Sequence, residues 1–345
     1  CSDGPRIDEF LAEMRREVFE GREGYMNVGE APGITPERNE FITNPAHKEL
    51  DMLFLFDHVS IDQSPESKWD THAFVPKKLQ DRMSRQQEAV RNAGWASLFF
   101  CNHDQPRVVS RWGNDSDRES RELSAKAFGM LLHMHRGTPY IYEGEELGMT
   151  NAHFTELGQY RDLEAINAYR QRVEEARCQS PESMMAALAL IGRDNARTPM
   201  QWDASRYAGF TPADAATEPW IGVNPNHVEI NAAEEFDDPD SVYGFYKKLI
   251  AMRHDSATVA TGEWNLLAAD DEQVYAFTRT SGDDTILVVV NLTDRSAGLP
   301  GEVAELLGDG VAESQILLST YDVAHGVKSI ARGELARWEG VVIQL

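Results

Sequence analysis

Short apolar runs that end abruptly in polar residues recur along the first half of the chain. In the clearest case, the run 97–101 (Ser-Leu-Phe-Phe-Cys) gives way to Asn102, His103, Asp104 and Gln105. A buried parallel strand that carries side chains to a site at its carboxyl end has this pattern. A polar turn that closes a strand has the same pattern, so the interpretation depends on how other strands end.

Three further apolar runs end in the same way: 25–28 leads to Glu30, 52–56 to Asp57, and 138–142 to Glu143. The segment 6–19 before the first run, and the segments 77–93 and 118–135 between later runs, have the 3.6-residue period of amphipathic helices. Strands that alternate with helices predict βα units, a parallel sheet and the α/β fold class. Four such strands are visible, whereas a closed (β/α) barrel needs eight.

The rest of the chain divides into two regions. Residues 151–240 are irregular apart from one helical piece at 163–176, and they are too many for a plain connection. We expect them to form a long loop insertion over the site, followed by a helix at 241–253. Beyond residue 262, short strands at 274–279, 285–290 and 340–345 predict a small all-β sandwich domain. The expected domains are therefore 1–261 and 262–345.

Composition narrows the class of partner. The formal net charge of −24 argues against nucleic acid and anionic membranes. No apolar run is long enough to span a membrane. Cys1, Cys101 and Cys178 are odd in number and widely spaced, which favours neither a disulfide framework nor a metal site. We therefore expect a cytoplasmic protein that binds a neutral substrate, without nucleic acid or membrane partners.

Carboxylates stand at all four predicted strand ends. If they converge on one apolar mouth, they raise each other's pKa, so that some remain protonated while others are ionised. Glycoside hydrolysis requires this division, because one acid protonates the leaving oxygen and an anion faces the oxocarbenium-like transition state. A metal site is the main competing use of clustered carboxylates.

Four stretches resemble the signature motifs of glycoside hydrolase family 13, the α-amylase family. They are 28–33 (Val-Gly-Glu-Ala-Pro-Gly), 102–107 (Asn-His-Asp-Gln-Pro-Arg), 142–149 and 195–203. Within the family they look most like the oligo-1,6-glucosidase and α-glucosidase branch. The resemblance implies the C-terminal half of a (β/α)8 TIM barrel, strands 5 to 8, followed by a C-terminal β-sandwich domain.

The resemblance also implies roles for individual residues. Glu30 matches the general acid/base after the fifth barrel strand. Asp104 matches the carboxylate that stabilises the transition state after the seventh strand, and His103 matches a residue that hydrogen-bonds sugar hydroxyls. Arg197 matches an arginine of the long loop that contacts substrate. Arg107 lies in the loop that shapes the entrance, and it too is expected to bind substrate. The acids at 143–146, like Asp57 and His58, are expected to be structural.

Two parts of the family pattern are missing from the 345 residues. Neither the Gly-Phe-Arg-x-Asp motif of the nucleophilic aspartate nor the Asn-His pair after the third strand occurs in this sequence. We therefore interpret the chain as a C-terminal fragment of a retaining α-glucosidase that is inactive alone. No cofactor is expected, because a calcium loop would lie in the missing part. An exposed half-barrel also predicts self-association or pairing with the missing half.

The expected substrates are short oligosaccharides of the isomaltose or maltose type, cleaved at terminal α-1,6 or α-1,4 bonds. Two alternatives stay open. One is a glucosyl-transferring or isomerising relative that acts on sucrose or trehalose-type sugars and shares Glu30, His103 and Asp104. The other is a non-enzymatic barrel kept as an interaction domain, as in transporter heavy chains, although such relatives tend to lose the catalytic carboxylates.

Overall fold

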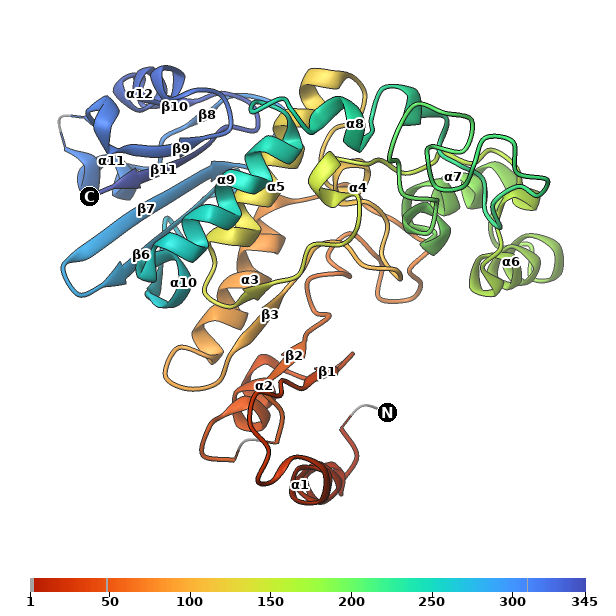
Figure 1. Ribbon diagram of the computed structural model, residues 1–345, viewed down its shortest axis with the longest axis horizontal. Coiled ribbons are helices and arrows are strands. Elements are labelled where there is room, and N and C mark those ends of the chain that lie inside the picture. Colours follow the sequence, from red (N-terminus) through yellow and green to blue (C-terminus); the bar gives the residue numbers. More distant parts are fainter. Residues whose placement is uncertain (1–2, 48, 309) are drawn as a thin grey trace.

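A four-stranded parallel sheet forms the first half of the molecule. In a computed structural model that describes residues 3–47, 49–308 and 310–345, its strands are β1 (Val28–Glu30), β2 (Met52–Phe54), β3 (Ala96–Leu98) and β4 (Thr138–Pro139). They lie in chain order and every neighbouring pair is parallel, which confirms the predicted βα arrangement (Figure 1). Cys1 lies outside the described residues, and both Cys101 and Cys178 are free thiols.

The strands are shorter than the apolar runs suggest, and the first begins three residues later than expected. Glu30 is consequently the last residue of β1 rather than a residue of the following turn. Phe99, Phe100 and Cys101 continue the apolar run after β3 and are all buried. Within the described residues, β1 pairs only with β2 and β4 only with β3. The sheet is therefore open, and its place in a closed barrel stays a prediction.

Helices connect these strands. They are α1 (Ile7–Met14), which continues into the π-helical turn η1 (Arg15–Phe19), α2 (Pro36–Thr43), α3 (Pro76–Ala89), α4 (Val108–Arg111) and α5 (Arg118–Met134). Side chains cap two of their N-termini: Thr35 accepts a hydrogen bond from the Arg38 amide, and Asp117 accepts one from the Ser120 amide. No helix in the described part of the chain is long and apolar enough to cross a membrane.

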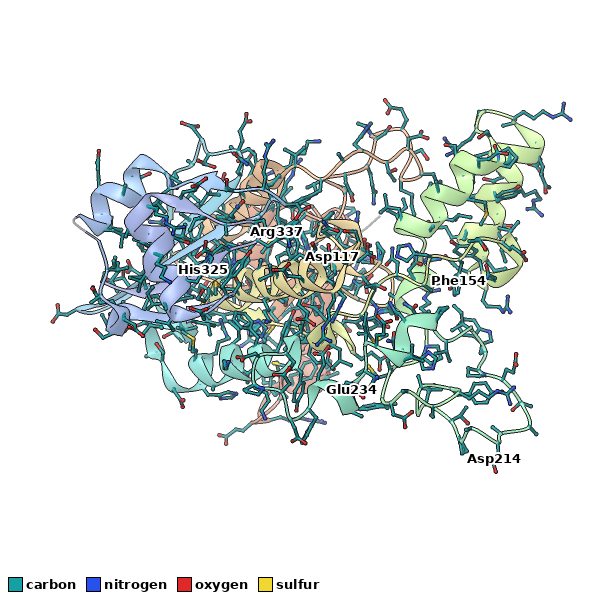
Figure 2. The ribbon with its side chains drawn as sticks, turned by 90° about the horizontal axis from the view of Figure 1, so that it is seen from above. Asp117, Phe154, Asp214, Glu234, His325 and Arg337 are labelled. Atoms are coloured by element: carbon teal, nitrogen blue, oxygen red, sulfur yellow. The ribbon has the colours of Figure 1, made fainter. Side chains whose placement is uncertain are left out.

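The region 151–240 contains more helix than its sequence predicts. Besides α6 (Leu163–Tyr169) with its π-helical continuation η4 (Arg170–Glu175), it forms α7 (Pro181–Ile191). The α7 sequence is almost uniformly apolar or small, so no polar stripe marks its helical period. The two helices enclose a separate apolar cluster that also buries Trp69. Figure 2 shows Phe154 and Asp214 of this region at the opposite end of the molecule from His325.

The remaining elements of this region are short. They are η3 (Leu157–Gln159), η5 (Arg193–Ala196), η6 (Pro225–Val228) and α8 (Ala232–Glu235). Another short element, η2 (Glu145–Leu147), precedes the region. The expected helix at 241–253 is present as α9 (Val242–Asp255), and α10 (Ala257–Thr261) follows it.

The C-terminal part is built on an antiparallel sheet in the order β5-β6-β7-β11-β9. The strands are β5 (Glu263–Leu267), β6 (Val274–Ser281), β7 (Asp284–Asn291), β9 (Ile316–Ser319) and β11 (Gly340–Gln344), with a ribbon of β8 (Ala297–Gly298) and β10 (Glu334–Leu335). The expected C-terminal β domain is present, but it is not built of strands alone, because α11 (Gly301–Leu307) and α12 (Val323–Arg332) also belong to it. Both helices are short and lie between strands, where turns were expected.

This antiparallel sheet is buried on both faces. Tyr275, Phe277 and Val288 point from one face into the large core that contains α5 and α9. The alternate residues on the other face, among them Ala276 and Leu287, pack against the ribbon and the helices α11 and α12. The sheet is thus shared by two cores (Figure 1). The predicted boundary at residue 262 divides the sequence, but no gap in packing accompanies it.

A buried carboxyl group lies below the end of β4. Glu145 of η2 is 3 % exposed and accepts a hydrogen bond from the Tyr246 hydroxyl of α9 at 3.1 Å. Gly144 precedes it with φ 88°, a conformation that favours glycine. Burial raises the pKa of Glu145 to about 7, because the apolar surroundings disfavour its charged form.

Replacing a residue of the shared sheet tests whether the two cores unfold together. Phe277 is fully buried, so Phe277→Ala should lower the free energy of unfolding by about 3–5 kcal/mol. Phe210 is 55 % exposed, so Phe210→Ala should change it by less than about 0.5 kcal/mol. Urea unfolding followed by both fluorescence and circular dichroism should show one shared transition. Two separate transitions in the wild type would contradict a shared core.

The raised pKa of Glu145 should make stability depend on pH. Because the folded state holds this proton more tightly, the contribution of Glu145 to stability is complete below about pH 4.5 and is lost as the pH rises to about 7. Glu145→Gln removes this loss. Its stability relative to the wild type should therefore increase by about 2–3 kcal/mol between pH 4.5 and 7.5. Glu305→Gln, at an exposed position of α11, serves as the control in urea titrations at both pH values.

Candidate functional site

A pocket of about 220 Å³ opens at the carboxyl end of the parallel sheet. All four strands or the residues directly after them line it: Glu30 from β1, Phe54 and Phe56 from β2, Phe99, Cys101, Asn102 and His103 from β3, and Tyr140, Ile141 and Tyr142 from β4. The carboxyl ends of parallel strands meet at one edge, so side chains distant in sequence converge there. Aromatic walls with a few polar groups suit the apolar faces and hydroxyl groups of a sugar.

Glu30 supplies a carboxylate at this pocket. It is exposed, and its strand is held by parallel pairing with β2, where Glu30 stands opposite Phe54. Among the described residues, no hydrogen bond or ion pair engages its carboxylate. The carboxylate is therefore open to contact with a molecule bound in the pocket.

His103 and Asp104 lie on a tight turn after β3. The Asp104 amide donates a hydrogen bond to the side-chain oxygen of Asn102 at 2.8 Å, and the Gln105 amide donates to the Asn102 carbonyl at 3.3 Å. The two interpretations of this stretch are therefore compatible, because the turn places His103 in the pocket. The His103 side chain is 65 % exposed, and its Nε2 lies 3.8 Å from Asp104 Oδ2.

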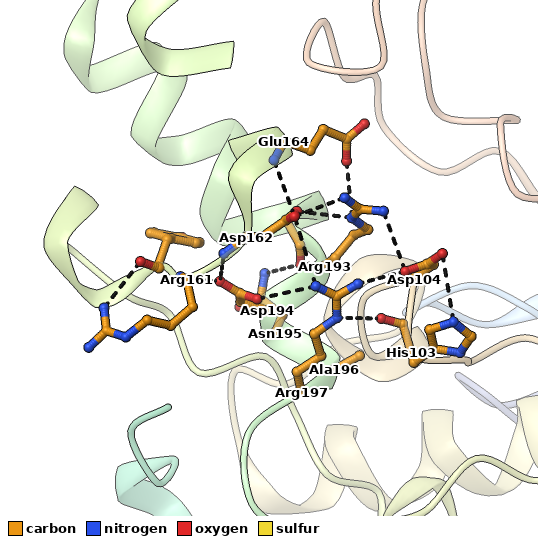
Figure 3. Close-up of polar contacts among 12 residues, drawn as sticks. His103, Asp104, Arg161, Asp162, Glu164, Arg193, Asp194, Asn195, Ala196 and Arg197 are labelled. Carbon is orange, nitrogen blue, oxygen red and sulfur yellow. Dashed lines mark hydrogen bonds and ion pairs between the residues drawn. The ribbon is translucent and has the colours of Figure 1, made fainter. Parts of the chain in front are cut away.

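Two guanidinium groups hold the Asp104 carboxylate. Arg197 Nη2 donates to Asp104 Oδ1 at 2.6 Å, and Arg193 Nη1 lies 3.5 Å from the same oxygen (Figure 3). Arg197 Nε also donates to the His103 carbonyl at 2.8 Å, so one guanidinium fixes both the side chain and the turn. Both arginines come from the short helix η5 and the residue after it, in the loop region.

Buried carboxylates in turn hold these arginines. Asp162, 4 % exposed in its side chain, accepts two hydrogen bonds from Arg193 at 2.8 and 2.9 Å. Burial favours the neutral acid, but the hydrogen bonds and charge of Arg193 outweigh it and lower the pKa of Asp162. Asp194 is fully buried, lies 3.6 Å from Arg197 Nη1, and accepts from the amides of Arg161 and Asp162. The hydrogen bond with Asp162 raises the pKa of Arg193, which stays charged.

Arg107 does not lie where a substrate contact would. It is 1 % exposed, and its guanidinium donates to the Glu143 carbonyl at 2.5 Å and the Ala196 carbonyl at 3.2 Å. It also packs over the Tyr142 ring, with 5.1 Å from Cζ to the ring centroid. The expectation that Arg107 binds substrate is therefore revised: this arginine ties the loop after β4 to the segment that carries Arg197.

The residues expected to be structural do have structural contacts. His58 is buried, and its Nε2 lies 2.9 Å from the Phe99 carbonyl, beneath the pocket. Burial lowers the pKa of His58 to about 4, so it is neutral near pH 7. Asp57 accepts a hydrogen bond from Gln86, and Glu145 bonds Tyr246 as described above.

The sequence patterns did not indicate the residues that hold Asp104 in place. These are Arg193, Asp194, Asp162, Glu164 and Lys68. Arg193 and Asp194 directly precede a recognised motif, which was a usable signal. Asp162 caps α6 and has the sequence signature of a helix start. Lys68 lies almost a hundred residues away from its partner Glu164, and no local pattern indicates that pair.

Within the described residues, no group of three or more His, Cys, Asp or Glu side chains is arranged to hold a metal ion. The carboxylates at the strand ends are spread along the sheet edge, and Asp104 is engaged by arginines.

Comparisons with known proteins match this geometry. The family model of the α-amylase catalytic domain matches residues 1–262, and that of the maltogenic amylase C-terminal domain matches residues 264–313. The oligo-1,6-glucosidase of Parageobacillus thermoglucosidasius is 42 % identical over 347 residues, which cover 99 % of this chain and 59 % of the relative. The α-glucosidase of Pediococcus pentosaceus is 47 % identical over 283 residues, 81 % of this chain and 50 % of the relative.

Two solved structures are similar over 99 % of the chain. Trehalose-6-phosphate hydrolase of Bacillus licheniformis superposes with a TM-score of 0.85 at 37 % identity and is covered over 60 % of its length. A mutant of the trehalulose synthase MutB gives a TM-score of 0.88 at 34 % identity, also over 60 % of its length. The chain thus spans about three fifths of the length of these relatives. Residues of three of the four motifs line one pocket. The family model covers most of the chain, so the chain belongs to the α-amylase family, glycoside hydrolase family 13.

Proposed function

We propose that this chain forms part of a retaining α-glucosidase that cleaves terminal α-1,6 or α-1,4 glucosidic bonds of short oligosaccharides such as isomaltose and maltose. The observation that carries the proposal is the pocket itself, where Glu30 and His103 meet among aromatic walls. The relatives named oligo-1,6-glucosidase and α-glucosidase, at 42 % and 47 % identity, support this choice of reaction.

Glu30 is proposed as the general acid and base. Its carboxylate is exposed at the pocket and unengaged within the described residues, so it can give a proton to the leaving oxygen and later take one from water. Asp104 supplies the negative charge that faces the developing oxocarbenium ion. His103, largely exposed beside it, offers ring nitrogens to sugar hydroxyls.

Arg197 is proposed to act chiefly through Asp104. A carboxylate that accepts a 2.6 Å hydrogen bond from a guanidinium keeps its orientation. Preorganised charge of this kind stabilises a transition state without the cost of reorienting during the reaction. The acid and the nucleophile of a retaining glycosidase are both carboxylates, so we propose no cofactor.

The 345-residue sequence does not contain the Gly-Phe-Arg-x-Asp motif. A retaining glycosidase needs a second carboxylate about 5 Å from the acid, on the other side of the scissile bond. We therefore propose that this chain alone cannot form the glycosyl-enzyme intermediate, and that it binds sugar without hydrolysing it.

Assays of the purified chain test this proposal. We expect no release of p-nitrophenol from p-nitrophenyl α-glucoside, but measurable binding of isomaltose or maltose by saturation-transfer NMR. His103→Ala should weaken that binding about fivefold, the value of one net hydrogen bond, and His254→Ala on exposed α9 should not change it. If the chain alone turns over the substrate and Glu30→Gln abolishes that turnover, the proposal that it cannot hydrolyse sugars is contradicted. If neither sugar binds, the proposal that the pocket is a sugar site is contradicted.

The open sheet predicts self-association. Strands β1 and β4 each leave one edge unpaired within the described residues, and such edges pair readily with other chains. Sedimentation velocity of the purified chain should therefore show dimers or larger species whose fraction grows with concentration. A single monomeric species across the micromolar range would contradict this prediction.

An isomerising or glucosyl-transferring enzyme is the alternative within the same chemistry. The structural similarity to the trehalulose synthase, with a TM-score of 0.88, favours it, whereas sequence identity to the oligo-1,6-glucosidases is higher. Product analysis of sucrose reactions by a protein that contains this chain would distinguish the two. The exposed Glu30 and the arginine-bound Asp104 argue against a purely structural barrel. We also propose a cytoplasmic location for the protein.

A further inference from the structure

The charged residues around Asp104 form an almost completely paired rim. Lys68 Nζ lies 2.7 Å from Glu164 Oε2, and the same oxygen lies 3.2 Å from Arg193 Nε. Arg193 also approaches Asp104, the neighbour of the pocket residue His103, so contacts run without a break from Asp104 out to Lys68 (Figure 3 shows the part from Asp104 to Glu164). Arg172 pairs with Asp70 at 2.6 Å on the same two segments.

These pairs join two loops that are distant in sequence. Lys68 and Asp70 belong to the connection between β2 and α3, whereas Glu164 and Arg172 belong to α6 and its continuation. Between the two ion pairs, Trp69 is buried in the apolar cluster of α6 and α7. The rim therefore contains two ion pairs that join these loops on either side of a buried tryptophan.

The balance of charge on this rim indicates whether the site suits a neutral or an anionic substrate. Its carboxylates are Asp70, Asp104, Asp162, Glu164 and Asp194, and its cations are Lys68, Arg172, Arg193 and Arg197. Every one of these cations contacts a carboxylate. A phosphate group needs basic side chains that are not already neutralised, because binding of an anion next to unscreened carboxylates is repulsive.

We infer that Glu164 is a specificity-determining residue of this site: by neutralising Lys68 and Arg193 beside Asp104, it suits the site to uncharged sugars and against sugars that carry a phosphate. The inference rests on the proposed function, because it concerns the surroundings of Asp104, the carboxylate proposed to face the developing oxocarbenium ion. It separates this chain from its structural neighbour named trehalose-6-phosphate hydrolase, to which it is similar in fold.

Removal of the Glu164 charge should have a directional effect. Glu164→Gln keeps the size and an acceptor oxygen, but it leaves Lys68 without its ion pair and Arg193 with one carboxylate fewer. Both donors can then turn to an anion. Since hydrogen bonds to charged groups are stronger than neutral ones, the affinity for a phosphorylated sugar relative to its neutral counterpart should rise about tenfold. The gain should shrink at high salt.

The experiment measures binding of trehalose and trehalose 6-phosphate to the 345-residue chain by NMR titration, with isomaltose as the reference sugar. We expect the wild type to bind the phosphate ester more weakly than trehalose. Glu164→Gln should lower the ratio of the dissociation constant of trehalose 6-phosphate to that of trehalose about tenfold. Glu175→Gln, which removes an exposed carboxylate paired with Arg170 on the same helical segment, should leave the ratio unchanged. Lys68→Met combined with Glu164→Gln should cancel most of the gain.

The possible outcomes distinguish a failure of the role given to Glu164 from a failure of the proposed function. Equal or tighter binding of trehalose 6-phosphate by the wild type would overturn the inference without any variant. An unchanged ratio in Glu164→Gln, with thermal unfolding like that of the wild type, would overturn the role of Glu164. Absence of isomaltose binding in the wild type would contradict the proposed function itself, and the inference with it.

Discussion

The contact between Arg197 and Asp104 is the interaction on which the arrangement of the site depends. It joins the turn after β3 to the loop region, and it requires two buried acids, Asp162 and Asp194, to keep the arginines in place. Removing one member of such a buried network leaves its partners charged and uncompensated, which costs far more than the net stabilisation of the intact pairs. The network therefore contributes more to holding the site in one geometry than to the stability of the protein.

Much of the sheet and part of the site could be predicted from sequence. Strand ends were recognisable because apolar runs stop at Glu30, Asp57 and Asp104, and parallel strands bring such ends to one edge. Glu30 and His103 do line one pocket, although β1 starts later than the apolar pattern suggests. The motifs indicated which residues form the site, and the fold shows that Glu30 and His103 lie at the same pocket.

What could not be predicted is tertiary in origin. Arg107 carries no local sign of burial, and only its neighbours Glu143 and Ala196 show that its donors are already used. The helix α7 lacks a polar stripe because it is packed among other helices. The two C-terminal helices are short enough to pass for turns between strands. Ion pairs such as Lys68–Glu164 join loops with no shared pattern in sequence.

The position of β11 has a consequence for how the protein is made. This strand, Gly340–Gln344, lies between β7 and β9 rather than at an edge of the sheet. On the ribosome, β7 and the apolar side of α5 are synthesised long before the strand that completes their shared layer. Their apolar surfaces stay uncovered until Gln344 has left the exit tunnel, so this core cannot close before β11 has been synthesised. The interval is one in which a chaperone has a surface to hold.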